Sequence, residues 1–313
     1  MKKWDRNTFR QRIRSLLAPV AVGVVLLVLL GIVANVTWND YRNALIDSQT
    51  RQLELVVQST ADSIQFSLDE YADRLDAAAD KLRTNPLSRP TLARSDTLAD
   101  LWIEDSDGNV IYRCYGLTPM CDVLITRTSS ISYWQYHRGD RHYLVMKKAV
   151  GDQTICLVID SETLYQQLVS DIHVGTNGYI MVKNADNRVV MHPESEQWGI
   201  EVLEGRRKLY REDLEMSSLE ELLRAQQEED SGIRDYYSYW WTDPDVPRVR
   251  KISAYRHLSI GSSFWIVSAV VDYDDLYKPV AESFQKVALL FLSIAVVLGL
   301  FLVLVFRLQQ KER

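Results

Sequence analysis

Two long stretches without charged residues lie near the ends of this chain and constrain its fold more than any other feature. The first runs from Ser15 to Trp38 and contains LLAPVAVGVVLLVLLGIVANV, and the second, VALLFLSIAVVLGLFLVLVF, occupies Val287–Phe306. Each is long enough to cross a hydrocarbon layer of about 30 Å as a helix. The sequence therefore predicts transmembrane helices at 15–38 and 287–306, with residues 39–286 between them.

The first apolar stretch has two other interpretations, a cleaved signal peptide or a buried core helix. A signal peptide has a shorter apolar region, followed by a cleavage site made of small residues. Here the apolar region is long, no good cleavage site follows it, and no lipoprotein-type cysteine stands at its end. We therefore expect the N-terminus to stay attached to the membrane.

Basic residues at the two ends of the chain predict its orientation. They precede the first apolar stretch and follow the second: Lys2, Lys3, Arg6, Arg10, Arg12, Arg14, Arg307, Lys311 and Arg313. Lys and Arg concentrate on the cytoplasmic side of a membrane. We expect a two-pass protein of the bacterial cell membrane, with residues 1–14 and 307–313 cytoplasmic and residues 39–286 extracytoplasmic.

Composition and motifs exclude several classes of function. A chain with 47% hydrophobic residues and 25% charged residues is typical of folded protein, and a net charge of −6 argues against nucleic-acid binding. No nucleophile elbow, HExxH, P-loop or GxGxxG occurs. The segment EDSDGN lacks the later acidic ligands of a calcium loop and is predicted to be a hairpin turn. We expect no enzyme activity, no cofactor and no metal site.

A long amphipathic helix is predicted after the first apolar stretch. Its apolar positions recur every three or four residues: Ile46, Leu53, Val57, Thr60, Ile64, Leu68, Tyr71, Leu75 and Leu82. The pattern ends at NPLSRP, where Pro86 and Pro90 stop a helix. From Trp38 to Thr84 such a helix is about 70 Å long. One stripe would pack on a folded module and another could meet a partner helix, although an ordinary core helix explains the same stripe.

Two pairs of similar segments indicate an internal repeat. IEDSDGNVI, Ile103–Ile111, aligns without a gap with VKNADNRVV, Val182–Val190. Further along, VIDSETLY, Val158–Tyr165, aligns with VVDYDDLY, Val270–Tyr277. In the second pair an apolar strand ends on an aspartate that caps the next helix. The order of the two pairs predicts two copies of one supersecondary unit.

Each copy contains several predicted strands joined by Gly- and Asx-rich links, as in antiparallel sheets. The strands of the first copy are ADLWIED, NVIYRCY, HYLVMKKAV and TICLVID, and those of the second are GYIMVK, RVVMHP, IRDYYSYWW, VRKISAYRHL and FWIVSAVV. Within the second copy, residues 194–230 separate RVVMHP from IRDYYSYWW; they are acidic, with leucines at helical spacing and a helix start at Ser217 or Ser218. We expect one or two covering helices there.

The whole arrangement resembles the double Cache (dCache) sensor domains of bacterial membrane receptors. The most specific stretch is Gly175–Pro193, in which G-x-x-G-Y-I-x-V, a polar turn and V-V-M-H-P resemble the opening of the family's membrane-proximal module. The resemblance implies an α+β fold, in which a long N-terminal helix and linker, 39–97, precede two tandem PAS-like antiparallel-sheet modules. These would be a membrane-distal module at 98–171 and a membrane-proximal module at 172–286, flanked by the two transmembrane helices.

The same resemblance implies a ligand site, because the family binds small extracellular molecules such as amino acids, usually in the distal module. In the amino-acid-binding members an Arg and a Trp-Tyr pair hold the carboxylate, and an Asp holds the ammonium. The corresponding candidates are Arg127, Tyr133, Trp134, Tyr143 and Asp160. The aromatic pair stands here in reversed order, and the arginine lies further upstream than in the family pattern.

A second interpretation of these residues needs no ligand. Asp160 has a repeat counterpart in Asp272, so both could simply cap helices. The aromatic residues of YWQYHRGDRHY could simply pack across strands. In the same region, Cys114 and Cys121 bracket YGLTPM and could form a disulfide in an oxidising compartment, or both could remain thiols. These alternatives stay open at the level of the sequence.

Three functions fit the predicted arrangement. In the first, the chain is a membrane-anchored sensor that binds a small ligand, such as an amino acid or amine, and signals through its helices to a separate membrane protein or within a homodimer. In the second, it is an accessory or scaffold protein whose outer domain binds a protein. In the third, it is the sensor portion of a longer receptor, such as a histidine kinase, diguanylate cyclase or chemoreceptor, because RLQQKER is too short to form an output domain.

Overall fold

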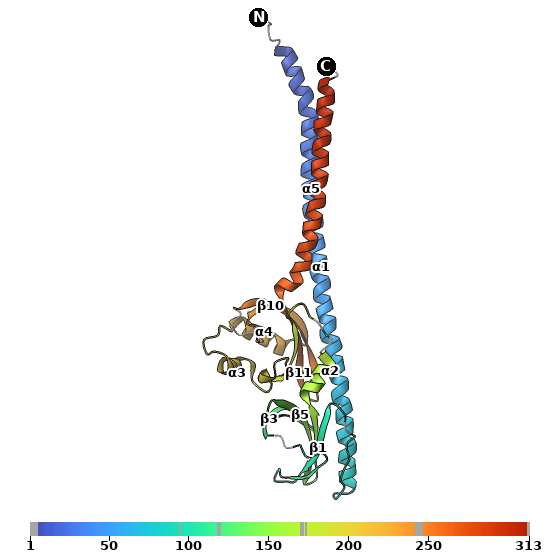
Figure 1. The fold of residues 1–313 in the computed structure, drawn as a ribbon, viewed down its shortest axis with the longest axis vertical. Helices are drawn as coiled ribbons and strands as arrows, with labels where there is room; N and C mark the ends of the chain where they lie inside the picture. The colour runs from blue at the N-terminus through green and yellow to red at the C-terminus, as the bar shows by residue number, and fades with distance from the viewer. Residues whose placement is uncertain are drawn as a thin grey trace. The chain divides into compact units, whose positions relative to one another are not determined.

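The computed structural model describes residues 6–93, 95–117, 120–169, 172, 174–241 and 247–311. Two compact units are present: residues Thr50–Asp275 form one, and the helical segments up to Gln49 and from Leu276 onward form the other. The larger unit contains two antiparallel sheets and the C-terminal part of the first helix (Figure 1). The α+β class predicted from the sequence is confirmed.

Helix α1 (Arg6–Thr84) is continuous over 79 residues and ends just before Pro86, as predicted. Its predicted apolar stripe is confirmed from Leu53 to Leu82, because every predicted position between them is buried, whereas Ile46 is only partly buried. Spacing of three and four residues places these side chains on one face of the helix. That face packs in the core of the larger unit.

The first sheet, here called sheet A, has six strands where the sequence predicted four. Its strands are β1 (Leu98–Glu104), β2 (Val110–Arg113), β3 (Met120–Arg127), β4 (Ser132–Arg138), β5 (Arg141–Val150) and β6 (Gln153–Asp160). Their order across the sheet is β2-β1-β6-β5-β4-β3. Strands β3 and β4 are the two that the sequence patterns missed. Helix α2 (Ser161–Val169) follows β6.

The second sheet, sheet B, has five strands in the order β8-β7-β11-β10-β9. They are β7 (Tyr179–Asn184), β8 (Val189–Met191), β9 (Ser231–Ser238), β10 (Val249–Ile260) and β11 (Ser263–Asp272). Five strands of sheet A, β2-β1-β6-β5-β4, have the same connectivity as all five of sheet B. The predicted repeat is therefore present in the topology, with β3 as an additional edge strand of sheet A.

The two matching hairpins are alike down to individual hydrogen bonds. In the first, Asp105 N donates to Asn109 O at 2.9 Å, and the Asp105 carboxylate accepts from Asp107 N at 3.0 Å and Asn109 N at 2.8 Å. In the second, Asn184 N donates to Arg188 O at 2.9 Å, and the Asn184 side chain accepts from the amides of the residues two and four positions on, at 3.0 and 2.8 Å. EDSDGN is thus a turn, with its aspartate engaged by backbone amides.

The insertion between β8 and β9 forms a short 3-10 helix, η1 (Ser195–Gln197), and the helices α3 (Val202–Leu209) and α4 (Ser217–Glu228). Together α3 and α4 cover the face of sheet B opposite α1 (Figure 1). The predicted start at Ser217 is confirmed. No side chain caps α4 at its N-cap residue, Met216, and Ser218 Oγ accepts from Tyr237 N at 2.9 Å. This bond ties α4 to β9.

Specific contacts join the two sheets. Trp265 Nε1 on β11 donates to Thr126 Oγ1 on β3 at 2.8 Å, and the rings of Tyr133 and Trp265 meet edge to face at 5.4 Å. The Asn184 side chain donates to the carbonyl of Ile125. Trp265 is fully buried, so the additional strand β3, together with Tyr133 on β4, contributes to the contact between the sheets.

The smaller unit contains the N-terminal part of α1 and, from Leu276 onward, helix α5 (Tyr273–Lys311). Both helices contain a segment long and apolar enough to cross a membrane, by length and composition. Their apolar side chains are largely exposed, with 6% and 0% of the two most apolar segments buried. Trp38 and Phe284 pack with ring centroids 4.1 Å apart.

Candidate functional site

The five ligand residues predicted from the sequence do not meet at one point. Trp134 and Tyr143 lie on the face of sheet A that carries the cluster of Trp102, Tyr136, Val145, Cys156 and Val158. Tyr133 lies on the opposite face, since neighbouring residues of a strand alternate. Arg127 is exposed at the end of β3. Only Trp134 and Tyr143 are thus brought to a common cluster.

Two of the predicted residues have structural partners. Tyr133 packs against Trp265, and burial raises its pKa to about 12, so its hydroxyl stays protonated at neutral pH. Asp160 Oδ1 accepts from Thr163 N at 2.9 Å, as expected of an N-cap of α2, and its other oxygen lies 3.7 Å from Arg141. Their role in ligand binding stays a prediction.

A largely buried ion pair lies on the same face as Trp134 and Tyr143. Lys147 Nζ is 3.0 Å from both carboxylate oxygens of Glu104, although the two residues are 43 positions apart in the chain. Their side chains are only 14% and 11% exposed. Trp102 Nε1 donates to Glu104 Oε1 at 2.9 Å. The pair therefore has fixed geometry and little contact with water.

Aromatic rings enclose the lysine of this pair. Its ammonium lies 5.2 Å from the ring centroids of both Trp134 and Tyr136, within the range of a cation–π interaction. Burial acts to lower the pKa of Lys147, but the nearby Cys156, Tyr136 and Glu104 outweigh it and raise the pKa above its ordinary value. Lys147 therefore stays charged at neutral pH.

A second carboxylate shapes the loop next to this cluster. Asp100 is fully buried on β1, and its two oxygens accept from Tyr115 N at 2.9 Å and Leu117 N at 2.8 Å. In the same loop the Cys114 thiol donates to Pro90 O at 3.2 Å. Cys114 is a free cysteine in this structure, so the disulfide predicted with Cys121, whose side chain lies outside the described residues, is not formed here.

Solved structures with a similar fold give this geometry a context. The ligand-binding domain of the Pseudomonas aeruginosa amino-acid chemoreceptor PctB, in complex with L-Arg, matches with 14% identity and a TM-score of 0.50, over 73% of this chain and 97% of that structure. The periplasmic sensory domain of the Campylobacter jejuni chemoreceptor Tlp1 matches with 11% identity and a TM-score of 0.53, over 75% and 99%. No family model and no curated protein matches the sequence.

This chain has the fold of bacterial chemoreceptor sensor domains. The double Cache arrangement expected from the sequence is thereby confirmed: a long helix followed by two antiparallel sheets. Sheet A lies within residues 98–171, the predicted membrane-distal module of this double Cache fold. Glu104 and Lys147 were missed as candidates because each looks locally like an ordinary charged residue at the end or middle of a strand.

The chemistry of the Glu104–Lys147 pair suits a molecule that carries both charges. When a zwitterion binds, the Glu104 carboxylate can pair with the ammonium of the ligand and the Lys147 ammonium can pair with its carboxylate. No buried charge is then left unpaired. The rings of Trp134 and Tyr136 form an apolar wall beside the lysine. No group of three or more His, Cys, Asp or Glu in the described part of the chain could hold a metal ion.

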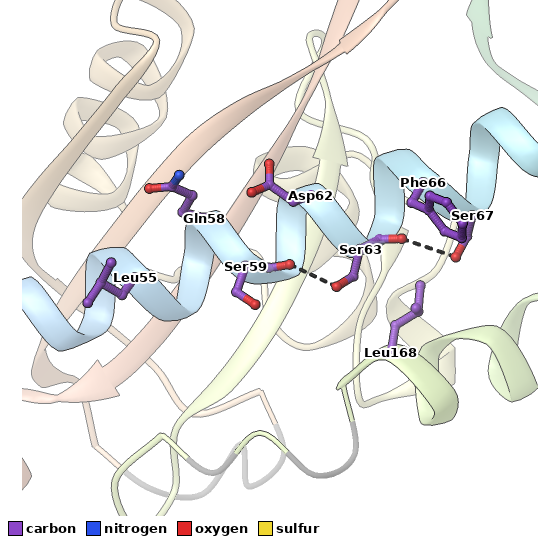
Figure 2. Close-up of a pocket in the computed structure, with 8 residues that line it drawn as sticks. All are labelled: Leu55, Gln58, Ser59, Asp62, Ser63, Phe66, Ser67 and Leu168. Carbon is purple, nitrogen blue, oxygen red and sulfur yellow. Dashed lines mark hydrogen bonds between the residues drawn. The ribbon is translucent and has the colours of Figure 1, made fainter.

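A separate groove lies along α1, beside helix α2 (Figure 2). Its volume is about 630 Å³, and its lining residues are Leu55, Gln58, Ser59, Asp62, Ser63, Phe66, Ser67 and Leu168. Ser63 and Ser67 each donate to the carbonyl four residues earlier, at 2.9 and 3.1 Å, so their hydroxyls are satisfied within the helix. The groove is open and has no buried charged group. It therefore has fewer features of a small-molecule site than the Glu104–Lys147 cluster.

Proposed function

We propose that this chain is a membrane-anchored extracytoplasmic sensor and that sheet A binds a small zwitterion, such as an amino acid, between Glu104 and Lys147. The observation that carries the proposal is the buried ion pair with its aromatic wall, at 3.0 Å from Nζ to both carboxylate oxygens. The ligand carboxylate would pair with Lys147 and its ammonium with Glu104. The role is recognition without catalysis.

The structural relatives support a ligand of this class. PctB was solved in complex with L-Arg and also with L-Gln, the latter matching this chain with a TM-score of 0.50 and 15% identity. Both ligands carry an α-carboxylate and an α-ammonium. The same two groups are the ones that a carboxylate and an ammonium of the protein can bind together.

Membrane anchoring rests on the two apolar helices. Most of their described apolar side chains are exposed, and a hydrocarbon layer would stabilise such helices. The basic residues at both chain ends favour a cytoplasmic position for both termini. Ligand binding would shift the equilibrium between two arrangements of the helices. The shift would be detected by a separate membrane protein, by a second copy of the chain or by a cytoplasmic portion of the receptor.

The competing function is a scaffold whose outer domain binds a protein partner. Thermal unfolding of the purified full-length chain in detergent separates the two functions. A zwitterion sensor should show a saturable rise in Tm with one or more L-amino acids. The corresponding amino-acid amide, which lacks the carboxylate, and the N-acetyl derivative, which lacks the ammonium, should produce no rise.

Variants of neighbouring lysines localise the effect. Lys147→Met should abolish the rise in Tm, whereas Lys148→Met should preserve it. Lys148 is the matched control because it follows on the same strand, points to the other face and pairs with Asp76 of α1. If no L-amino acid raises the Tm of the folded protein, the zwitterion proposal is wrong and the scaffold function gains support.

A further inference from the structure

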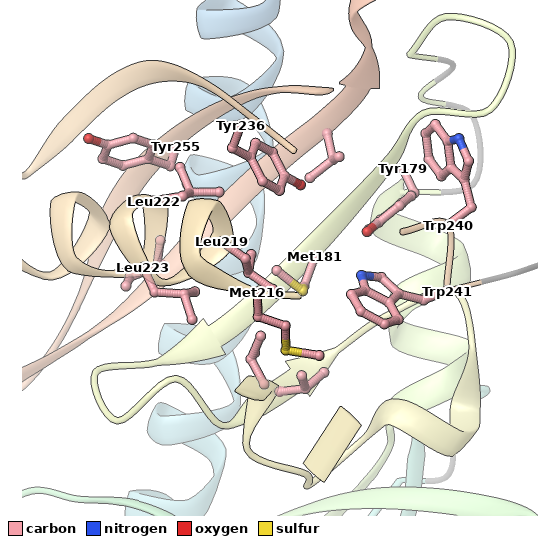
Figure 3. Close-up of a cluster of buried hydrophobic side chains, with 14 of the residues drawn as sticks. Tyr179, Met181, Met216, Leu219, Leu222, Leu223, Tyr236, Trp240, Trp241 and Tyr255 are labelled. Atoms are coloured by element: carbon pink, nitrogen blue, oxygen red, sulfur yellow. The ribbon is translucent and has the colours of Figure 1, made fainter. Parts of the chain in front are cut away.

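A group of basic side chains is buried in the sheet B module, away from the Glu104–Lys147 cluster. Arg206 on α3, Lys183 on β7, Lys251 on β10 and His192 after β8 are each 1% exposed or less. They border the core cluster between sheet B and helices α3 and α4, whose aromatic and apolar members Figure 3 shows. Fully buried basic side chains are rare because removing a charge from water costs several kcal/mol unless the charge is paired.

Arg206 has few polar partners for a buried guanidinium. Its Nε donates to Gln197 Oε1 at 2.8 Å, and its terminal nitrogen lies 3.7 Å from Met181 Sδ, a weak acceptor. The guanidinium stacks over the ring of Trp241 at 4.1 Å. Within residues 174–241 and 247–311 no carboxylate forms an ion pair with it. Unlike a lysine, an arginine cannot avoid the cost of a buried, unpaired charge by losing its proton.

The two lysines and the histidine are equally short of negative partners. Lys251 Nζ donates to the carbonyl of Tyr239 and lies 3.7 Å from the ring centroid of Trp240. Lys183 Nζ donates to the side-chain oxygen of Asn187. His192 Nδ1 accepts from Glu194 N at 3.0 Å, while its buried Nε2 has no partner among the described atoms. The oxygens that accept hydrogen bonds from the two lysines are therefore neutral ones.

Burial and the charge of Arg206 both disfavour the protonated forms of the other basic groups. Burial is the first cause that lowers the pKa of Lys251 to about 6, and the charge of Arg206 is the second. Burial and Arg206 also lower the pKa of Lys183 and of His192 well below their ordinary values. The region is consequently one of positive potential inside the protein. A negative charge that entered it would interact favourably with Arg206 and would favour protonation of Lys251.

We infer that Arg206 and Lys251 form a second binding site, which takes a small organic carboxylate without an ammonium group. The guanidinium fork matches the two oxygens of a carboxylate, and a lysine adds a point charge from the adjoining strand. Asp272 stands opposite Lys251 on β11 and Glu201 lies near Arg206, but in the described part of the chain neither forms an ion pair with these cations. The cluster thus has an excess of positive groups, which separates this ligand class from the zwitterion proposed for sheet A. Four aromatic side chains surround the cations: Tyr179, Tyr236, Trp240 and Trp241.

The surroundings favour a carboxylate with a short carbon chain over an inorganic anion. The hydroxyl groups of Tyr179 and Tyr236 point toward one another above Met181 and Trp241 (Figure 3). These two hydroxyls can donate to carboxylate oxygens. The indole rings, the leucine side chains of α4 and Met216 just before this helix provide apolar contact for the carbon chain. An oxyanion such as phosphate would leave oxygens facing these apolar groups without donors.

The test uses the full-length chain in detergent, titrated with sodium acetate, pyruvate and succinate against sodium chloride at equal ionic strength. Tryptophan fluorescence gives a second readout besides Tm, because Trp240 and Trp241 lie beside the cations. We expect a saturable rise in Tm and a saturable fluorescence change with at least one of the three carboxylates. Both changes should persist in Lys147→Met, which separates this site from the one in sheet A.

Variants on α3 and β10 identify the site. Arg206→Met should abolish both changes, and Lys251→Met should weaken binding at least about tenfold. Arg207→Met is the matched control, because Arg207 is the next residue of α3, is partly exposed and pairs with Glu220, and it should bind as the wild type does. Absence of a saturable response to all three carboxylates, or an unchanged response in a folded Arg206→Met or Lys251→Met protein, would overturn the inference.

Discussion

Replacing Lys251 with methionine should stabilise this protein, although it removes a hydrogen bond. At pH 7 a lysine whose pKa is about 6 is mostly neutral in the folded state, while in the unfolded chain it has an ordinary pKa of 10.5 and is charged. Giving up that proton costs about 5 kcal/mol, since each pKa unit corresponds to about 1.4 kcal/mol. Methionine has a similar length and incurs no such cost.

Two losses oppose this gain. The hydrogen bond to the carbonyl of Tyr239 disappears, and that carbonyl is left without this donor, at a cost of about 2–3 kcal/mol. The net stabilisation is therefore about 2 kcal/mol, which for a domain of this size raises Tm by roughly 4–8 °C. Thermal unfolding of the full-length wild type and Lys251→Met at pH 7 without added carboxylate measures it.

The pH dependence of stability gives a second sign of the same cause. Between about pH 6 and pH 10 the unfolded wild-type chain holds a proton on Lys251 that the folded chain has released, so stability rises with pH by up to about 1.4 kcal/mol per unit. Arg206, Asp272, Tyr179 and Tyr236 also surround this site and stay unchanged in the variant.

Between pH 6.5 and 8.5 Lys251→Met should accordingly lose the share of this slope that comes from Lys251, while Lys183, whose pKa is also lowered by burial, keeps its own share. If the variant is less stable than the wild type at pH 7 and keeps the same slope, Lys251 is charged and paired in the folded protein. The argument that burial keeps Lys251 neutral in the folded protein would then be refuted.

Three further variants test the fold. Asp160→Ala should cost about 1 kcal/mol through loss of the cap on Thr163, and the response to L-amino acids should remain; loss of that response would restore Asp160 as a ligand residue. Gly178→Ala should cost more than about 3 kcal/mol or prevent folding, because an added Cβ would lie 1.9 Å from the carbonyl oxygen of Val174; normal expression and Tm would contradict this geometry. Trp265→Phe should cost about 1–3 kcal/mol because it removes the bond to Thr126, and an unchanged Tm would show that this bond does not stabilise the pairing of the sheets.

The elements predictable from the sequence are those with local signals. The turns at Asp105 and Asn184 were found because both use an Asx side chain to accept backbone amides, which gives matching sequence patterns. The apolar stripe of α1 follows directly from helical spacing. Strand β4, SYWQYHR, was missed as a strand because polar and aromatic residues occupy both faces: Tyr133 meets Trp265 on one, and Trp134 lies beside Lys147 on the other.

The site residues were less predictable because their partners are distant in the chain. Glu104 and Lys147 become a pair only when β1, β6 and β5 align in register. Arg206 stands in the run GRRKL, in which nothing local distinguishes the buried arginine from its exposed neighbours. One local signal was available for Lys183 and Lys251. Each lies in an apolar strand, on the same face as a buried residue two positions away, Met181 for Lys183 and Ser253 for Lys251.

Isothermal titration of an L-amino acid that raises Tm into the full-length wild type and Glu104→Gln is the decisive measurement for the sensor function. The amide replaces the carboxylate at nearly the same size, so it removes the charge that would hold the ligand ammonium. We expect the wild type to bind one zwitterion per chain through sheet A and Glu104→Gln to bind at least about tenfold more weakly, as loss of a charged hydrogen bond predicts. Equal affinity in the two proteins would show that the ligand does not bind between Glu104 and Lys147.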